Sequence, residues 1–311
     1  MTGQSDTSSE PREIYLLGIG TGHSVGPPMH NCIAKSLGLP WTYHTKECPS
    51  IEDCLALLRS KKCAGAAITM PFKHSILAHL DERDQLIDSL NACNTVSKSA
   101  DGELVGTNVD WCGIAGALEE GRAGLDEPAK KTGLVIGAGG ASRAAVYALA
   151  TQMGCTTIYI LNRDVQEVLD LQADIEARYI QKPRLVHLLA EEQVSSLPTP
   201  TYIVGTVPDF EPATKEEKTV KSILEAFLAR PEKGVLLDMC YRPRRTRHIR
   251  LGEQLDWRTV EGIYVVGHQA EHQWAAWAGE EGASKLDKDG MWRELRKAAD
   301  ESALVTPKVQ V

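Results

Sequence analysis

Two stretches in the first 70 residues carry the hydrophobic pattern of buried strands, and an amphipathic helix lies between them. Residues 14–19 are apolar and end in a glycine-rich turn, and residues 64–69 are small and apolar and end before Pro71. Between them, Ser50 can cap a helix together with Asp53. The helix has one apolar stripe, made of Ile51, Cys54, Leu55 and Leu58. Strand, helix and strand in this order predict parallel pairing with a right-handed crossover.

A second series of strands and helices follows a polar, glycine-bearing stretch at residues 119–128, which predicts a domain boundary. Strands are predicted at 133–136, 157–161, 201–205 and 234–238, with a short one at 263–266, and helices at about 141–153 and 164–179. Such alternation predicts a doubly wound parallel sheet. A final helix is predicted from Gln269, with Ala270, Trp274 and Trp277 on one face and Gly279 as its stop.

Composition is that of an ordinary globular protein and excludes several classes. Hydrophobic residues make up 42% of the 311 residues and charged residues 24%, and the net charge of −8 argues against nucleic-acid binding. The eight cysteines form no Cys-x-x-Cys pair and no Cys/His grouping with zinc spacing. We therefore expect no metal site, and free buried thiols in a reducing compartment. No apolar run approaches the ~20 residues that span a bilayer, and the first eleven residues lack a signal-peptide core. We expect a cytoplasmic protein without a membrane partner.

The glycine-rich loop after the strand at 133–136 has the context of a dinucleotide-binding site. Its residues are Gly137, Ala138, Gly139, Gly140 and Ala141, and an alanine-rich helix follows. A loop without bulky side chains lets the backbone approach a pyrophosphate, and the helix N-terminus supplies free amides and a positive dipole end. Ser142 replaces the third glycine of the usual pattern but is small enough for close packing. We predict a Rossmann-type dinucleotide domain at 121–267, a purely structural turn being the alternative.

The residues after the next strand bear on the choice between NAD and NADP. The chain there reads Asn162, Arg163, Asp164. Arg163 could stack on adenine or bind a 2′-phosphate, which favours NADP. Asp164, with Glu167 and Asp170 nearby, would repel that phosphate and could accept a hydrogen bond from a ribose hydroxyl. One arginine against several carboxylates favours NAD, with NADP as the alternative.

Three stretches of the first domain are rich in small polar groups, at residues 20–31, at 69–73, and at 91–95 leading towards 106–111. Polar groups at strand ends are well placed to line a pocket for a polyol. We predict an α/β chain whose residues 1–120 form an α/β substrate-binding catalytic domain with a mainly parallel sheet. The C-terminal helices at 268–311 are expected to return to this first domain.

These stretches and the glycine loop together resemble the shikimate/quinate dehydrogenase family from about residue 14 to 280. The motifs are His-Ser-x-x-Pro at 23–27, Thr-x-Pro-Phe-Lys at 69–73, Asn-Thr at 94–95, Asn-x-Asp at 108–110, Gly-Ala-Gly-Gly-Ala-Ser-Arg at 137–143, Asp-Met-x-Tyr at 238–241 and Gly-His-Gln-Ala at 267–270. Asp110-Trp111, the turn at 206–208 and the loop at 241–244 look most like the dehydrogenase module of the fungal multifunctional shikimate-pathway enzyme.

By this resemblance Lys73 and Asp110 form the catalytic pair. Oxidation of a ring hydroxyl needs a group that takes the O–H proton as hydride leaves the carbon. A lysine is a poor base at neutral pH unless its environment shifts its pKa, and a neighbouring carboxylate would shift it the wrong way. Asp110 is therefore expected to orient the lysine and the substrate hydroxyl. The reverse assignment of roles stays open because coupled groups titrate as a pair. A non-catalytic interpretation also stays open, in which Lys73 is a surface lysine and Asp110 an N-cap residue.

The resemblance also implies the remaining contacts. Ser24 and Tyr241 would bind the substrate carboxylate. The ring hydroxyls would contact Thr69, Asn94, Asp110 and Gln269. Cofactor contacts beyond the glycine loop would come from Asn162, Arg163, Asp164, Thr206, Val207 and Gly267.

Two positions depart from the family pattern and bear on the substrate. Gly26 stands where the family usually has a second hydroxyl residue, and Ala67 where it commonly has asparagine. The missing hydroxyl at Gly26 should weaken carboxylate binding but leaves room beside C1 of the ring. Quinate, which is tetrahedral at C1 and carries an extra hydroxyl there, suits that room better than the flat shikimate.

We therefore predict an NAD-dependent dehydrogenase, a monomer or homodimer, that oxidises quinate to 3-dehydroquinate, with oxidation of shikimate to 3-dehydroshikimate left open. The first alternative is an NADP-dependent shikimate dehydrogenase of aromatic amino acid biosynthesis. The second is a non-catalytic regulatory protein on the same fold. The latter is disfavoured because such a protein need not keep both Lys73 and Asp110.

Overall fold

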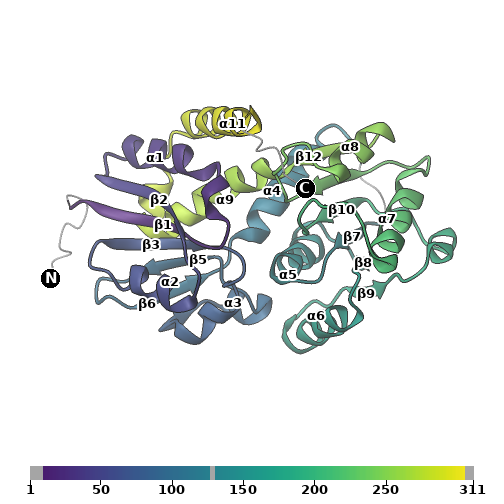
Figure 1. The fold of residues 1–311 in the computed structure, drawn as a ribbon, viewed down its shortest axis with the longest axis horizontal. Helices are drawn as coiled ribbons and strands as arrows, with labels where there is room; N and C mark the ends of the chain where they lie inside the picture. The colour runs from purple at the N-terminus through teal and green to yellow at the C-terminus, as the bar shows by residue number, and fades with distance from the viewer. Residues whose placement is uncertain (1–9, 127–129, 305–311) are drawn as a thin grey trace. The chain divides into compact units, whose positions relative to one another are not determined.

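The computed structural model describes residues 10–126 and 130–304, which form two compact units (Figure 1). The first unit contains residues 10–87, 92–109 and 269–304, and the second contains 88–91 and the described part of 110–268. The chain passes between them at Val109–Asp110, whereas the expected boundary at residue 120 lies inside helix α4 (Asp110–Arg122). The assignment of substrate to one unit and dinucleotide to the other stays a prediction.

The first unit is built on a six-stranded mixed sheet in the order β2-β1-β3-β5-β6-β4. Its strands are β1 (Arg12–Gly18), β2 (Trp41–Glu47), β3 (Cys63–Ile68), β4 (Glu82–Arg83), β5 (Thr95–Lys98) and β6 (Leu104–Thr107). β1 pairs in parallel with both β2 and β3, so the parallel pairing predicted from the strand–helix–strand order is confirmed. β5 runs antiparallel to its two neighbours, and β4 is parallel to β6.

The first unit contains several helices, and the start of α2 shows how local sequence satisfies free amides. They are α1 (Gly26–Ser36), α2 (Ile51–Leu58), α3 (Gln85–Leu90), the later part of α9 (Gly262–Ala278), α10 (Glu280–Ala283) and α11 (Lys288–Leu304). The predicted capping box of α2 is present, because the Ser50 hydroxyl accepts from Asp53 N while the Asp53 carboxylate accepts from Ser50 N. Helix α1, inside a stretch read only as polar, starts with prolines in its first turn, where a missing N–H costs nothing.

The tail of the chain supplies the aromatic core of the first unit. Trp274 Nε1 donates to His30 Nδ1 at 3.1 Å, and Trp277 Nε1 donates to Val96 O at 3.1 Å. A Cβ added at Gly65 would lie 2.5 Å from both the Trp277 ring and Val96 O, so only glycine admits this ring beside β3. Helix α9 ends at Ala278 before Gly279, whose φ is +82°, as its sequence position predicts. Helix α11 packs on α1 (Figure 1).

The second unit contains a parallel six-stranded sheet in the order β12-β11-β10-β7-β8-β9. Its strands are β7 (Thr132–Ile136), β8 (Thr157–Leu161), β9 (Arg184–His187), β10 (Tyr202–Gly205), β11 (Val235–Asp238) and β12 (Arg258–Glu261), and its helices besides α4 are α5 (Gly140–Tyr147), α6 (Val165–Arg178), α7 (Lys215–Leu228) and α8 (Arg247–Gln254). The strand order reverses between β7 and β10, which confirms the doubly wound fold and creates its ligand-binding switch point.

The strand predicted at 263–266 is wrong, because these residues form the start of α9. A short apolar run can be a buried helix as well as a strand, and its periodicity cannot separate the two. The strand at this edge, β12, precedes the run and has only one buried residue, Val260. The short edge strand β9 was not predicted, since it has no fully buried position.

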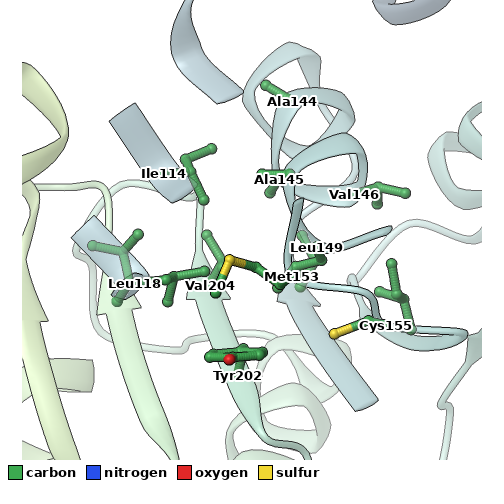
Figure 2. Packing of buried hydrophobic residues seen from close by; sticks show 14 of the residues in the cluster. Ile114, Leu118, Ala144, Ala145, Val146, Leu149, Met153, Cys155, Tyr202 and Val204 are labelled. Atoms are coloured by element: carbon green, nitrogen blue, oxygen red, sulfur yellow. The ribbon is translucent and has the colours of Figure 1, made fainter. Parts of the chain in front are cut away.

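Close packing of α4 and α5 covers one face of this sheet (Figure 2). Ile114 and Leu118 of α4 and Ala145 of α5 are fully buried with Val204 of β10. The alanines let α5 approach closely, and the segment continues as a π-helical turn, Ala148–Gln152, whose Leu149 also enters this core. The eight cysteines of the chain are free thiols. No helix in the described part of the chain is long and apolar enough to cross a bilayer.

Candidate active site

Strand register gathers several predicted substrate residues at one edge of the first sheet. Thr69 follows β3, and Thr95 of the antiparallel β5 lies opposite Ala67, which places Asn94 opposite Ile68 at that same edge. β6 is antiparallel to β5 with Thr107 opposite Thr95, so the chain leaves the sheet through Asn108 at this edge too. Ser24 belongs to the loop that leaves the parallel strand β1 there.

The loop after β1 is anchored by Glu47 at the end of β2. Its carboxylate accepts from Gly20 N at 2.8 Å, from Gly22 N at 3.1 Å and from the Thr21 hydroxyl at 3.1 Å. These donors, the Gly20 amide first among them, lower the pKa of Glu47 and keep it charged. Sequence reasoning missed Glu47, although a carboxylate that ends a strand paired with β1 is a signal for such an anchor.

Ser24, Gly26 and His30 form one local arrangement. The Ser24 hydroxyl accepts from Gly26 N at 3.2 Å, which satisfies an amide at the start of α1. A Cβ at Gly26 would lie 3.3 Å from Ser24 Oγ and 3.5 Å from the His30 ring, so a side chain there would fill the space between these two groups. His30 is buried, stacks on Tyr43 at 4.1 Å, and has its pKa lowered to about 3 by desolvation. It is therefore neutral at physiological pH.

The segment that carries Lys73 is tied to the sheet edge by its backbone. Thr69 N donates to Leu17 O at 2.9 Å, and Ile19 N donates to Met70 O at 2.9 Å. Lys73 O accepts from Cys93 N at 2.7 Å, which links the lysine to the segment leading into Asn94. The side chain of Lys73 is half-buried. These backbone hydrogen bonds to the strand ends thus fix the position of the Lys73 backbone.

Asn94 and Asn108 shape the turn that leads to Asp110. Asn94 Oδ1 accepts from Val109 N at 2.8 Å and from the Thr95 hydroxyl at 2.9 Å, and Asn108 Nδ2 donates to Ala92 O at 2.9 Å. The side-chain carbonyl of Asn94 therefore holds this turn, and its contact with a ring hydroxyl stays a prediction. Asp110 is the buried first residue of α4. Its pairing with Lys73 stays a prediction, since the two belong to different units.

In the second unit the glycine loop fits a pyrophosphate. Gly137 has φ +117°, and a Cβ there would overlap the Thr206 hydroxyl. That hydroxyl donates to Ile136 O at 2.8 Å and lies 2.7 Å from Ser142 Oγ, so Thr206 supports the loop. Gly139 caps α5 without a side chain, and a Cβ there would have no atom within 4 Å. The first amides of α5 are thus left to a ligand with acceptor oxygens.

The residues after β8 have structural partners. Asp164 caps α6, accepting from Gln166 N at 2.8 Å and from Glu167 N at 3.3 Å. Asn162 Nδ2 donates to Glu167 Oε2 at 2.8 Å and to Asp164 O at 2.9 Å. Arg163 Nη1 lies 2.5 Å from Glu217 Oε1 of α7, a partner that the sequence did not reveal because 54 residues separate them.

Buried Asp238, at the end of β11, organises the loop that contains Tyr241. Asp238 Oδ2 accepts from the Thr246 hydroxyl at 2.8 Å and lies 3.1 Å from His248 Nδ1, while Oδ1 accepts from Cys240 N at 3.1 Å. Tyr241 is half-buried within this loop. Asp238 was noticed only as part of a motif, and its position after a fully buried strand is the signal for its anchoring role.

The predicted site residues therefore divide between the two units. Ser24, Gly26, Thr69, Lys73, Asn94 and Gln269 lie in the first, and Asp110, Tyr241 and all predicted cofactor contacts lie in the second. Val207 and Thr206 follow β10 beside Gly137, whereas Gly267 is buried within α9. A cavity of about 600 Å³ lies at the opposite edge, by the amino-terminal ends of β10 and β11. The glycine loop and α5 favour the carboxyl edge for the cofactor.

Comparisons with known proteins match both halves of the chain. The shikimate dehydrogenase substrate binding domain matches residues 16–96, and the shikimate/quinate 5-dehydrogenase domain matches residues 119–231. The quinate dehydrogenase of Emericella nidulans is 32% identical over 292 residues, covering 87% of this chain and 89% of that protein. The chain belongs to the shikimate/quinate dehydrogenase family.

Other similar proteins include a much longer polypeptide and a solved enzyme of similar length. The pentafunctional AROM polypeptide of Eremothecium gossypii is 33% identical over 277 residues, which are 86% of this chain but only 17% of that protein. The shikimate 5-dehydrogenase of Thermus thermophilus, solved with NADP(H) and shikimate, is 28% identical and has a TM-score of 0.72, covering 92% of this chain and 99% of the solved one. The resemblance inferred from the motifs is therefore confirmed, as is the fold.

Proposed function

We propose that this chain oxidises quinate to 3-dehydroquinate with NAD, and that Lys73 and Asp110 transfer the hydroxyl proton. One observation carries the proposal: strand register brings the segment of Lys73 and the turn before Asp110 to one sheet edge with Ser24 and Asn94. Similarity to a quinate dehydrogenase along nearly its whole length supports the reaction class.

The dinucleotide, when bound at the glycine loop, would supply the acceptor for the hydride that leaves the ring carbon. Lys73 would take the hydroxyl proton as the carbonyl forms, and in the reverse direction it would return that proton and stabilise the developing alkoxide. Asp110 would orient the lysine and the hydroxyl. The amide of Asn94, held by its own carbonyl bonds, would position a second ring hydroxyl.

Gly26 supports quinate over shikimate. Without a side chain here, the space between Ser24 Oγ and the His30 ring holds no second hydroxyl for the carboxylate. The ring could shift into that space, which favours an acid with an additional group at C1. We propose NAD over NADP because Arg163 has acidic neighbours, with Asp164 next in the sequence and Glu217 in contact.

A second candidate is NADP-dependent oxidation of shikimate. It is favoured by the position of Arg163 at the end of β8, where its side chain is 59% exposed and a 2′-phosphate could reach it. The related enzyme of Thermus thermophilus was solved with NADP(H) and shikimate.

Initial rates with quinate and shikimate, each with NAD and with NADP, test the proposal. Quinate with NAD is expected to give the highest kcat/KM of the four combinations. Turnover of shikimate with NADP as the best pair would select the second candidate. Absence of turnover with all four would falsify both.

A further inference from the structure

Arg163 is held by a side chain from a distant helix. Its Nη1 lies 2.5 Å from Oε1 of Glu217, in the first turn of α7, and its guanidinium carbon lies 5.9 Å from the centre of the Phe210 ring. The ion pair and the ring contact together hold the guanidinium beside α7. Arg163 thus has a defined partner in the protein itself, although it lies where the adenosine ribose of a dinucleotide is expected.

Glu217 is built into the fold as a fixed anion. It is 9% exposed, and its Oε2 accepts from Ala213 N at 2.8 Å and from Thr214 N at 3.0 Å. The Thr214 hydroxyl in turn accepts from Glu217 N, which completes a capping box. The hydrogen bonds from Thr214 N and Ala213 N, with the Arg163 guanidinium, lower the pKa of Glu217 to about 2. The carboxylate is therefore charged at any working pH and cannot move away from Arg163 without breaking the cap.

Two further acidic residues lie close to Arg163 in the sequence. Asp164 is the next residue, and Glu167 lies one helical turn further, bound to Asn162. The guanidinium therefore contacts one carboxylate, that of Glu217, and two more acidic residues follow Arg163 within four positions of the chain. A phosphate on the ribose, with a charge near −2, would have to compete with Glu217 for the guanidinium and would also be repelled by these groups.

We propose that Glu217 is a specificity-determining residue that withholds Arg163 from an adenosine 2′-phosphate and so disfavours NADP. The inference deepens the proposed NAD-dependent function and rests on it. The site recognises the unphosphorylated ribose by keeping the arginine of this loop neutralised. The discriminating group thus lies on α7, outside the segment after β8 where specificity is usually sought.

Glu217→Gln is the sharpest test, because glutamine can still accept from Ala213 N and Thr214 N as a capping-box residue but has no charge for Arg163. The probes are adenosine 2′,5′-bisphosphate and ADP, titrated into the ligand-free protein by calorimetry. The ratio of their dissociation constants is expected to shift towards the 2′-phosphorylated probe by about 10-fold, which corresponds to about 1.4 kcal/mol. The kcat/KM ratio of NADP to NAD with quinate is expected to rise in parallel.

Glu216→Gln is the matched control. Glu216 is the preceding, exposed residue of the same helix, so its substitution removes the same charge without touching the Arg163 pair. An equal shift of the probe ratio in Glu216→Gln would overturn the clamp, by which we mean the hold of Glu217 on Arg163, in favour of a general charge effect. Adding Arg163→Ala to Glu217→Gln is expected to cancel the gain, and a gain that survives would also overturn the proposal.

The outcomes separate this inference from the proposed function. A protein that binds ADP but shows no change of probe ratio in Glu217→Gln, with thermal stability near that of the native chain, refutes the role of Glu217 alone. A native chain that prefers the 2′-phosphorylated probe refutes both the clamp and the NAD assignment. Normal probe binding without turnover of quinate or shikimate refutes the proposed reaction and leaves the clamp supported.

Discussion

His30 is expected to make the first unit sensitive to acid. Its ring is buried between Tyr43 and Trp274, and desolvation lowers its pKa from 6.5 to about 3. Below pH 6.5 the unfolded chain binds a proton at this histidine that the folded chain does not. The stability that neutral His30 contributes is therefore fully present above pH 6.5. It is lost as the pH falls towards 3, at about 1.4 kcal/mol of unfolding free energy per pH unit.

Between pH 7 and pH 5, His30 is expected to lower the free energy of unfolding by about 2 kcal/mol. Urea unfolding at the two pH values, followed by tryptophan fluorescence, measures it, since Trp41, Trp274 and Trp277 surround this core. The variant His30→Gln cannot titrate and can still accept from Trp274 Nε1. It should be less stable at pH 7, but its loss between pH 7 and pH 5 should be smaller than that of the native protein by about 2 kcal/mol.

His272→Gln serves as the control, because His272 is exposed on the same helix as Trp274. Its loss between pH 7 and pH 5 should equal that of the native chain. If His30→Gln keeps the native pH dependence, then His30 is either not neutral or not buried in solution, and the reasoning from desolvation is wrong.

Three further predictions concern the site. Lys73→Ala should lower kcat with quinate by at least about 100-fold, the scale of general acid–base catalysis. The affinity for NAD, measured by calorimetry, should stay near native because the glycine loop belongs to the other unit. A change confined to KM would contradict this prediction. Gly137→Ala should weaken NAD binding strongly and cost about 1–3 kcal/mol of stability, since φ is +117° and the new Cβ meets the Thr206 hydroxyl. Gly154→Ala is the control for backbone strain alone, because its φ is +73° and a Cβ there has open space. Gly26→Ser should shift kcat/KM from quinate towards shikimate, and an unchanged ratio would remove the specificity assigned to this position.

The sequence predicted the fold well where local signals and burial agree. The strand at 157–161 has its predicted bounds, and the Ser50 capping box is formed as predicted, because both depend on neighbours in the chain. Residues 263–266 were read as a strand because a short apolar run does not reveal its partners. Gly262, whose Cβ would overlap Met239 O, begins a helix there instead.

The candidate site was predictable as a set of residues but less so as a set of interactions. Thr206 and Asp164 were singled out as cofactor contacts, and each also holds local structure, one the glycine loop and the other the start of α6. Glu47 and Glu217 were not singled out at all. Glu47 contacts residues 25 to 27 positions away, and the Arg163 partner of Glu217 lies 54 positions away, so these contacts depend on the tertiary fold. By contrast, the capping box of Glu217 with Thr214 is local in the sequence.

The two tryptophans of α9 also set the order in which the protein can fold during synthesis. The Trp274–His30 and Trp277–Val96 hydrogen bonds join residues 244 and 181 positions apart. The ribosome therefore delivers the whole of the parallel sheet of the second unit before it delivers the aromatic rings that complete the first. Until then the face of β3 at Gly65, where the Trp277 ring packs, lacks that ring, so the core of the first unit is completed only near the end of synthesis.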